Sequence, residues 1–383
     1  MRLAPGRLFG QKENGFREED SMFSTRLPDI PGLPPLEALL GAFLTALFFL
    51  FLAAAVFGPF IAACCEAVGR SKGRIFHSKA ARQNAAMSLA AALPVSAALG
   101  GFLYYLIRDE PSLYGTPYAA PFIAVLVSAA LALVLLVLYF CVWKKTGIPG
   151  KGHVVTGFLA TFAAMAAGFS TLAFAHRYMH GAALDGAELM RNTLMENAES
   201  ALAANSALEN AEEIAGTMIE TASDAFPFSL QDLTDFFLFP ADSFFWPALL
   251  HILPLALGAA ATCGALWMLL SRARTDFGRD YYNFALPFNA RWALTGTLLS
   301  LPTAAFAYYR AGSFMLPELS HPPSLLLGGL CYGLPALSCL FWVFLLRSDT
   351  PLRHKPGIVL AFLCLLTGIS AQALVLNEII PSP

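Results

Sequence analysis

Residues 245–270 read FWPALLHILPLALGAAATCGALWMLL. This apolar run contains no Asp, Glu, Lys or Arg, and its single histidine is His251. A helix needs about 20 mostly apolar residues to cross the hydrocarbon core of a bilayer, and this run supplies them. Membrane helices tolerate its prolines and glycines, because neighbouring helices restore the backbone hydrogen bonds that are lost. The run therefore predicts a membrane-spanning helix that carries a histidine.

Seven further runs of the same kind extend this prediction to the whole chain. Charged residues make up 13% of the sequence, about half the usual share, and apolar residues make up 57%. We therefore expect an all-α integral membrane protein, an eight-helix bundle in contact with lipid, placed as a multi-pass protein in a bacterial inner membrane. The eight runs are 37–65, 83–107, 118–143, 154–178, 245–270, 292–310, 324–346 and 357–377.

Positive charge lies almost entirely in alternate gaps between the runs. Four gaps hold 15 of the 24 Lys and Arg residues of the chain: 66–82, 144–153, 271–291 and 347–356. The other gaps and their edges hold only Arg108, Arg177, Arg191 and Arg310. Because cytoplasmic loops carry the excess of Lys and Arg, the four basic gaps should face the cytoplasm. Both termini are then expected on the outer, periplasmic side.

The runs divide the chain into a polar tail over 1–36, two four-helix halves over 37–178 and 245–383, and an outer segment over 179–244. The tail lacks the apolar core of a signal peptide, and translation can begin at Met1 or at Met22. The outer segment is acidic, with Arg191 as its one basic residue after position 180, and part of it has helical periodicity. We expect either a solvated helix that covers the bundle or, at 185–224, a docking surface for a partner subunit or a periplasmic electron carrier.

The composition also weighs against several functions. The basic loops are explained by topology, so we expect no nucleic acid partner. The seven cysteines lie in or beside apolar runs without a CxxC motif, and are expected to be small buried side chains. The first, third and eighth runs contain no acid, base or histidine in their interiors, which disfavours a proton-coupled transporter. A transporter of an uncharged substrate is left open.

The histidines fall on two sides of the predicted bundle. His77, His153 and His354 lie in the basic gaps and are expected to be ordinary loop residues. The four on the outer side are His176, His180, His251 and His321. His176 and His180 share a helix face, and His251 lies about 9 Å below the interface at about 1.5 Å per residue. Each of the four can be an interfacial or core residue hydrogen-bonded to its surroundings, or a cofactor ligand.

We hypothesise that the outer histidines bind a b-type haem, because neutral imidazole is the usual axial ligand of haem iron. His251 lies deepest, and small residues follow it at 258–261, which can leave space for another helix or a flat cofactor. We expect His251 and His176 to be the two iron ligands. His180 and His321 are further candidates for cofactor binding.

Three stretches of the chain carry a resemblance to a known family. They are Gly58-Pro59-Phe60 with Cys65-Glu66, Trp143 to Gly147 through His153 with Tyr178-Met179, and the helix of His251 that ends at Ser271-Arg272-Ala273-Arg274. These stretches resemble parts of subunit I of the cytochrome bd-type quinol oxidases, whose first six helices the chain is similar to. The resemblance implies that His251 is the axial ligand of the low-spin haem, and that a quinone is the substrate.

The chain departs from that family at its oxygen-reducing site. The first run has no histidine at 45–49, the third run has no acid at 121–140, and the seventh run has no methionine at 324–333. The resemblance therefore implies a degenerate relative that lacks the oxygen-reduction site and is not an oxygen reductase. At most it is a subunit of a quinol-linked oxidoreductase.

The function expected from these observations is that of a membrane electron-transfer subunit. It would exchange electrons between quinone and a partner, through one b-type haem. Two alternatives stay open: a haem-free quinone-binding or anchoring subunit of a respiratory complex, and a non-redox transporter of an uncharged substrate.

Overall fold

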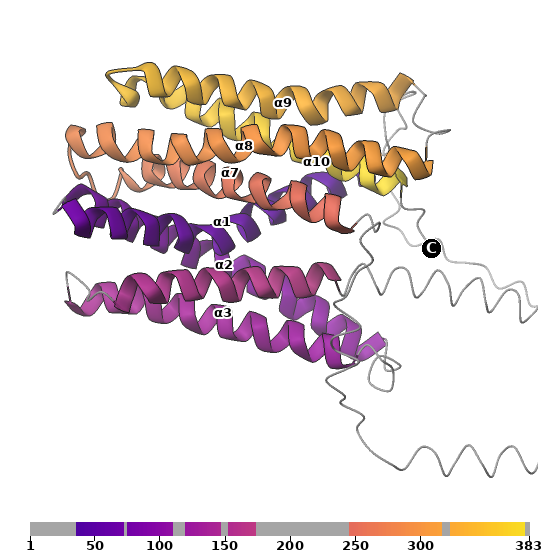
Figure 1. The fold of residues 1–383 in the computed structure, drawn as a ribbon, viewed down its shortest axis with the longest axis horizontal. Helices are drawn as coiled ribbons and strands as arrows, with labels where there is room; N and C mark the ends of the chain where they lie inside the picture. Colours follow the sequence, from indigo (N-terminus) through magenta and orange to yellow (C-terminus); the bar gives the residue numbers. More distant parts are fainter. Residues whose placement is uncertain are drawn as a thin grey trace, which may run out of the picture.

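The computed structural model describes residues 36–72, 75–109, 119–146, 152–173, 245–315 and 322–379. These residues form long helices, and no strand occurs among them (Figure 1). The helices are α1 (Leu36–Lys72), α2 (Ile75–Asp109), α3 (Ala119–Thr146), a helix over 152–173, α7 (Phe245–Ser271), α8 (Arg279–Met315), α9 (Pro322–Arg347), the 3-10 turn η2 (Pro351–His354) and α10 (Lys355–Ile379).

Seven of these helices are long and apolar enough to cross a membrane, which confirms an all-helical, multi-pass membrane protein. Each overlaps one of the apolar runs predicted from the sequence. The candidate spans are Leu36–Ser71, Ile75–Gly101, Ile123–Trp143, Gly152–Ala173, Phe245–Ser271, Gly328–Arg347 and Pro351–Val375.

The sixth predicted run, 292–310, lies inside α8, which does not belong to that set. Polar residues such as Asn289, Arg291 and Ser300 interrupt its apolar sequence. Two of them, Asn289 and Ser300, are buried, so their polarity faces the protein interior. α8 nevertheless lies alongside α7 and α9 for most of its length (Figure 1). Eight spans and the side on which the termini lie stay predictions.

α7 is the most buried of the candidate spans and packs against α1, α2, α8 and α10. α1 also packs against α2 and α10, and α8 also packs against α9. The helix over 152–173 lies against α1 through an edge-to-face contact of Phe158 with Phe60, 5.9 Å between ring centroids. Near its other end, Phe169 contacts Phe245 of α7 at 5.4 Å. These contacts join the described helices into one bundle.

The crossing of α7 and α8 depends on two glycines. A Cβ atom added to Gly296 would lie 2.4 Å from the backbone nitrogen of Gly258 and 2.7 Å from the carbonyl oxygen of Pro254. Both of these neighbours are backbone atoms, which cannot rotate away as a side chain can. Small residues at such crossings let two membrane helices approach closely, since lipid offers no hydrophobic force to press them together.

Two prolines in membrane helices are compensated by side chains of the neighbouring helix. Pro59 has no N–H, so the carbonyl of Ala55 loses its helical donor, and the Ser88 hydroxyl of α2 donates to it at 2.9 Å. Pro335 likewise frees the carbonyl of Cys331 in α9, which the Nε2 amide of Gln372 in α10 approaches at 3.4 Å. Each proline therefore ties its helix to the next one along the chain.

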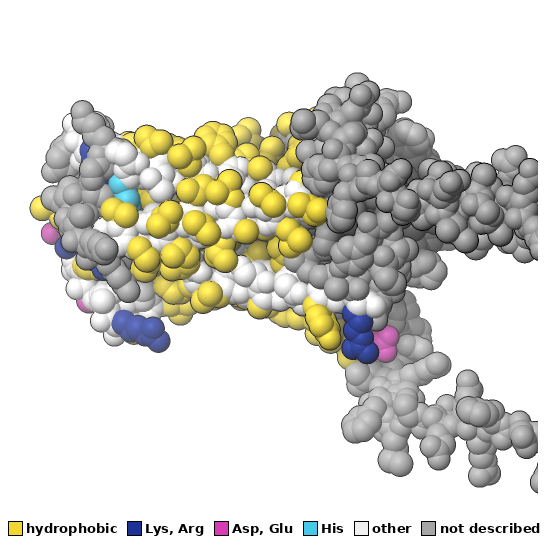
Figure 2. Space-filling model, turned by 90° about the horizontal axis from the view of Figure 1, so that it is seen from below, with side chains coloured by type: hydrophobic (Ala, Val, Ile, Leu, Met, Phe, Trp, Pro, Cys, Tyr) yellow, Lys and Arg dark blue, Asp and Glu magenta, His cyan; other side chains and the backbone are white. Residues whose placement is uncertain are grey.

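The surface of the bundle suits a bilayer. Figure 2 shows apolar side chains around its middle and Lys and Arg towards the two ends. The exposed apolar residues include Val127, Leu131 and Val134 of α3, each more than half exposed.

At one end of the bundle, the loop between α7 and α8 turns at Gly278, whose φ of 88° favours glycine. The Gly278 N–H donates a hydrogen bond to the Asp276 carboxylate. This hydrogen bond lowers the pKa of the Asp276 carboxyl group, and the hydrogen bond from Arg272 lowers it further by a smaller amount.

Candidate functional site

His251 is held at two points by neighbouring helices. Its Nδ1 atom lies 3.2 Å from the carbonyl oxygen of Ser300 in α8, and its Nε2 atom lies 3.3 Å from Oε1 of Gln372 in α10. The side chain is only partly exposed. The prediction that the residue lies inside a span is confirmed, because α7 contains it six residues after its start.

The carboxamide of Gln372 has a defined orientation. Its Nε2 amide faces the Cys331 carbonyl that Pro335 leaves without a helical donor. Turning the carboxamide over would bring two oxygens together at that place, which is unfavourable. Gln372 therefore presents its oxygen to His251, and the Pro335 kink in α9 fixes that arrangement.

A cavity of about 250 Å³ lies beside His251 and Gln372. Most of its lining is apolar, as ligand pockets usually are, with a few polar groups that can orient a guest. Helices α1, α7, α8, α9 and α10 all contribute. The polar side chains of the lining are Thr45, His251, Tyr308, Tyr332 and Gln372, and the larger apolar ones include Phe49, Ile252, Leu255 and Ile369.

The described residues around this cavity do not fit a haem. A ligand to iron needs a ring nitrogen whose lone pair points to the metal, and both nitrogens of His251 face protein oxygens within 3.3 Å. The other proposed haem residues, His176, His180 and His321, lie outside the described residues. Haem binding is therefore still a prediction, without support from the geometry at His251.

A second polar cluster, which the sequence analysis missed, lies at the end of α1 that leads into the basic loop. Glu66 is 1% exposed and accepts hydrogen bonds at Oε1 from Arg70, with Nε at 2.9 Å. Its Oε2 atom lies 2.8 Å from Nδ1 of His153 and 3.3 Å from the hydroxyl of Tyr139. We call Glu66, Arg70, Tyr139 and His153 the basic-end cluster.

His153 is not the ordinary loop residue that the sequence analysis expected. It lies in the first turn of the helix over 152–173 and is 5% exposed. Its Nε2 atom is 2.8 Å from the backbone oxygen of Tyr139, and its ring stacks on that of Tyr139 at 4.4 Å. His77 is also buried, in α2, whereas His354 is exposed as expected.

Two signals in the sequence point to the basic-end cluster. Glu66 and Arg70 are four residues apart, the spacing of an ion pair on one helix face. Glu66 also directly follows an apolar run, where a carboxylate is costly unless it is paired. Its partners from α3 and the next helix are distant in sequence, so no local pattern identifies them.

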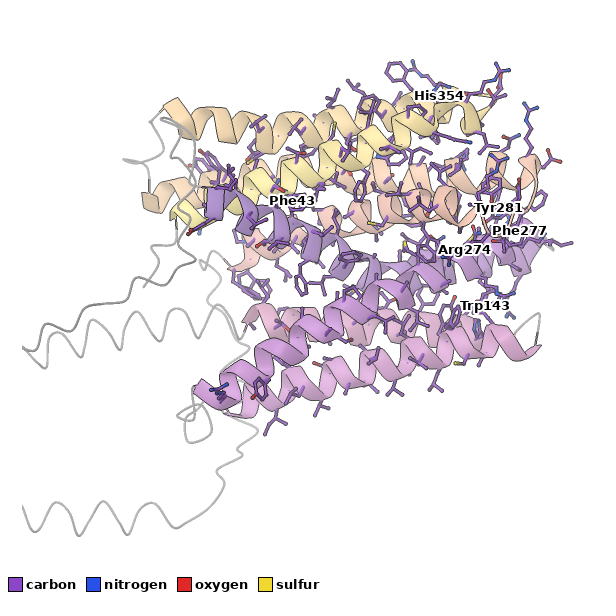
Figure 3. All side chains as sticks on the ribbon, turned by 180° about the vertical axis from the view of Figure 1, so that it is seen from behind. Phe43, Trp143, Arg274, Phe277, Tyr281 and His354 are labelled. Atoms are coloured by element: carbon purple, nitrogen blue, oxygen red, sulfur yellow. The ribbon has the colours of Figure 1, made fainter. Side chains whose placement is uncertain are left out.

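The two sites lie at opposite ends of the bundle. Figure 3 shows Trp143, Tyr281 and His354 at one end of the bundle, and Trp143 contacts His153 of the basic-end cluster there. Phe43 of α1 lies towards the other end, two residues before the cavity residue Thr45. The chain thus combines an apolar cavity with a few polar groups at one end and a buried ionic cluster at the other. No protein-family model matches the chain, and no curated protein matches it significantly.

Proposed function

We propose that the protein is a quinone-binding membrane subunit and that the cavity beside His251 receives the quinone ring. The supporting observation is the cavity itself, since an apolar lining with tyrosine hydroxyls, an imidazole and a carboxamide suits a flat apolar ring with carbonyl oxygens. The resemblance to cytochrome bd-type subunits supports the same substrate class. The volume of about 250 Å³ is below the usual range of ligand pockets, about 300–1,000 Å³, and therefore suits one ring system rather than a larger guest.

The chemistry assigned to the chain at this site is binding and orientation. Tyr308 and Tyr332 line the cavity with their rings roughly perpendicular at 6.4 Å, and a phenol can donate a hydrogen bond to a quinone carbonyl. His251 contributes its ring to the cavity wall, and Ser300 and Gln372 hold both of its nitrogens, so its part is to shape the site. Electrons would come from, or go to, a partner redox group.

The first test removes the two hydroxyl groups and keeps the rings. The double variant Tyr308→Phe, Tyr332→Phe should bind a short-chain quinone such as decyl-ubiquinone about tenfold more weakly, since each lost hydrogen bond contributes about 0.5–1.5 kcal/mol. Quenching of tryptophan fluorescence by the quinone measures the affinity in detergent. The matched control is Tyr309→Phe, because Tyr309 is 73% exposed and does not line the cavity. Equal affinities for both variants and the wild type would remove the cavity from the proposal.

An absorption spectrum of the purified protein separates quinone binding alone from electron transfer through haem. A haem held by His251 and His176 would give a sharp α-band on reduction with dithionite, and His251→Ala would abolish it. The geometry of His251 favours a spectrum without this band. The haem-free subunit is therefore the form of the proposal that we prefer, with the acidic segment 185–224, outside the described residues, as the docking surface for its partner.

The orientation belongs to the same proposal, because it determines which side of the membrane the cavity faces. Charge places position 148 in a cytoplasmic loop and position 205 in the outer segment. Single cysteines introduced there into a cysteine-free variant should react differently with an impermeant maleimide in intact cells, position 205 labelled and position 148 protected. The reverse pattern would place the quinone cavity near the cytoplasmic side.

A further inference from the structure

We infer that Glu66 and His153 form a buried proton-binding site at the basic end of the bundle, separate from the proposed quinone cavity. The inference begins with the two neighbours of the His153 ring. Nε2 lies 2.8 Å from the backbone oxygen of Tyr139, and Nδ1 lies 2.8 Å from Oε2 of Glu66. A backbone carbonyl can only accept a hydrogen bond, so Nε2 must carry a hydrogen.

The short contact at Nδ1 then requires a second proton. A neutral imidazole with its hydrogen on Nε2 would turn a bare Nδ1 towards a carboxylate oxygen at 2.8 Å, and two lone pairs would repel each other. One proton between Nδ1 and Oε2 converts this repulsion into a charge-assisted hydrogen bond. The pair therefore holds one proton more than a neutral histidine beside a carboxylate.

The surroundings place that proton on His153. Arg70 donates to Oε1 of Glu66 and the Tyr139 hydroxyl donates to Oε2, and both bonds favour the ionised carboxylate. The ring of Tyr139 stacks on the imidazole with an interplanar angle of 22°, and the face of an aromatic ring attracts a cation. Further groups around the pair in the described residues are Cys65 of α1, whose thiol donates to the backbone oxygen of His77, and Trp143 of α3.

The site connects three helices through one titratable contact. Glu66 belongs to α1, Tyr139 to α3 and His153 to the helix over 152–173. When the imidazolium releases its proton to water on the side of the basic loops, neutral His153 keeps one of its two hydrogen bonds and loses the other. Proton release therefore weakens the attachment of the helix over 152–173 to α1, and proton uptake restores it.

The test is the protonation state of His153 in the full-length protein. The chain is labelled with ¹⁵N-histidine, purified in detergent at pH about 7.5, and the His153 signals are identified by their loss in His153→Gln. We expect both ring nitrogens of His153 to carry hydrogen, and the exposed His354, identified in the same way, serves as the reference signal. Signals of a neutral tautomer for His153 would overturn the inference.

Glu66→Gln tests whether the carboxylate holds the proton in place. A carboxamide can donate its own N–H to a bare Nδ1, so His153 should become neutral, with hydrogen on Nε2 alone. If His153 stays doubly protonated in the variant, Glu66 is not part of the proton site. If the variant does not fold, the wild-type spectrum still decides whether the proton is bound.

Discussion

Alanine in place of Glu66 should destabilise the bundle by about 3 kcal/mol. The carboxylate is the acceptor for donors from three places: Arg70 on its own helix, Tyr139 on α3 and His153 on the next helix. Its removal leaves these donors buried or partly buried without that acceptor, and an uncompensated buried charge costs more than the pair contributes.

Thermal unfolding with a thiol-reactive dye measures this loss. Cys65, Cys331 and Cys339 are buried in the folded bundle and react when it opens. Glu37→Ala is the matched control, because Glu37 is an exposed carboxylate in the first turn of the same helix and its loss should cost less than about 1 kcal/mol. Glu66→Gln should lie between the two. Equal unfolding temperatures for Glu66→Ala and Glu37→Ala would mean that the cluster contributes no stability.

The second large effect is expected at the crossing of α7 and α8. Gly296→Ala places a methyl group where the backbone of Gly258 and Pro254 already stands, so the two helices must separate. Overpacking of this kind costs about 1–3 kcal/mol, and the upper end applies because no side chain can move aside. The displacement also moves Ser300, whose carbonyl contacts His251, and quinone affinity should fall together with stability.

Gly333→Ala is the control for the glycine substitution. Gly333 is also a helical glycine, in α9, but a Cβ atom there would meet no heavy atom within 4 Å. Its replacement should leave the unfolding temperature unchanged or raise it slightly, because alanine is the better helix former by about 0.5–1 kcal/mol. If both variants unfold at the same temperature, the close approach at Gly296 does not hold the helices together.

Hydropathy predicted most of the fold because lipid demands long apolar helices with internally paired backbones. It was less informative for α8, where Asn289 and Ser300 are buried against neighbouring helices. The place of His251 within an apolar helix followed from counting residues along its run. The roles of Gln372, Tyr308 and Tyr332 did not, since these residues lie on three other helices and only packing brings them to one cavity.

The histidine of the basic-end cluster escaped prediction for a related reason. His153 follows Lys144 and Lys145 and precedes an apolar run, which is the pattern of a loop at the membrane surface. Its burial depends on Tyr139 of α3 and on Glu66 of α1, and both residues belong to other helices. A pattern in one segment cannot report a contact that three segments make.

Ser88 and Gln372, which compensate for Pro59 and Pro335, also affect how the chain enters the membrane. Alone in lipid, α1 would expose the carbonyl of Ala55 and α9 that of Cys331, and an unpaired polar group there costs several kcal/mol. Since the compensating donor comes from the very next helix in each case, synthesis delivers it immediately afterwards. α1 with α2, and α9 with α10, are therefore favoured to partition into the bilayer as hairpins.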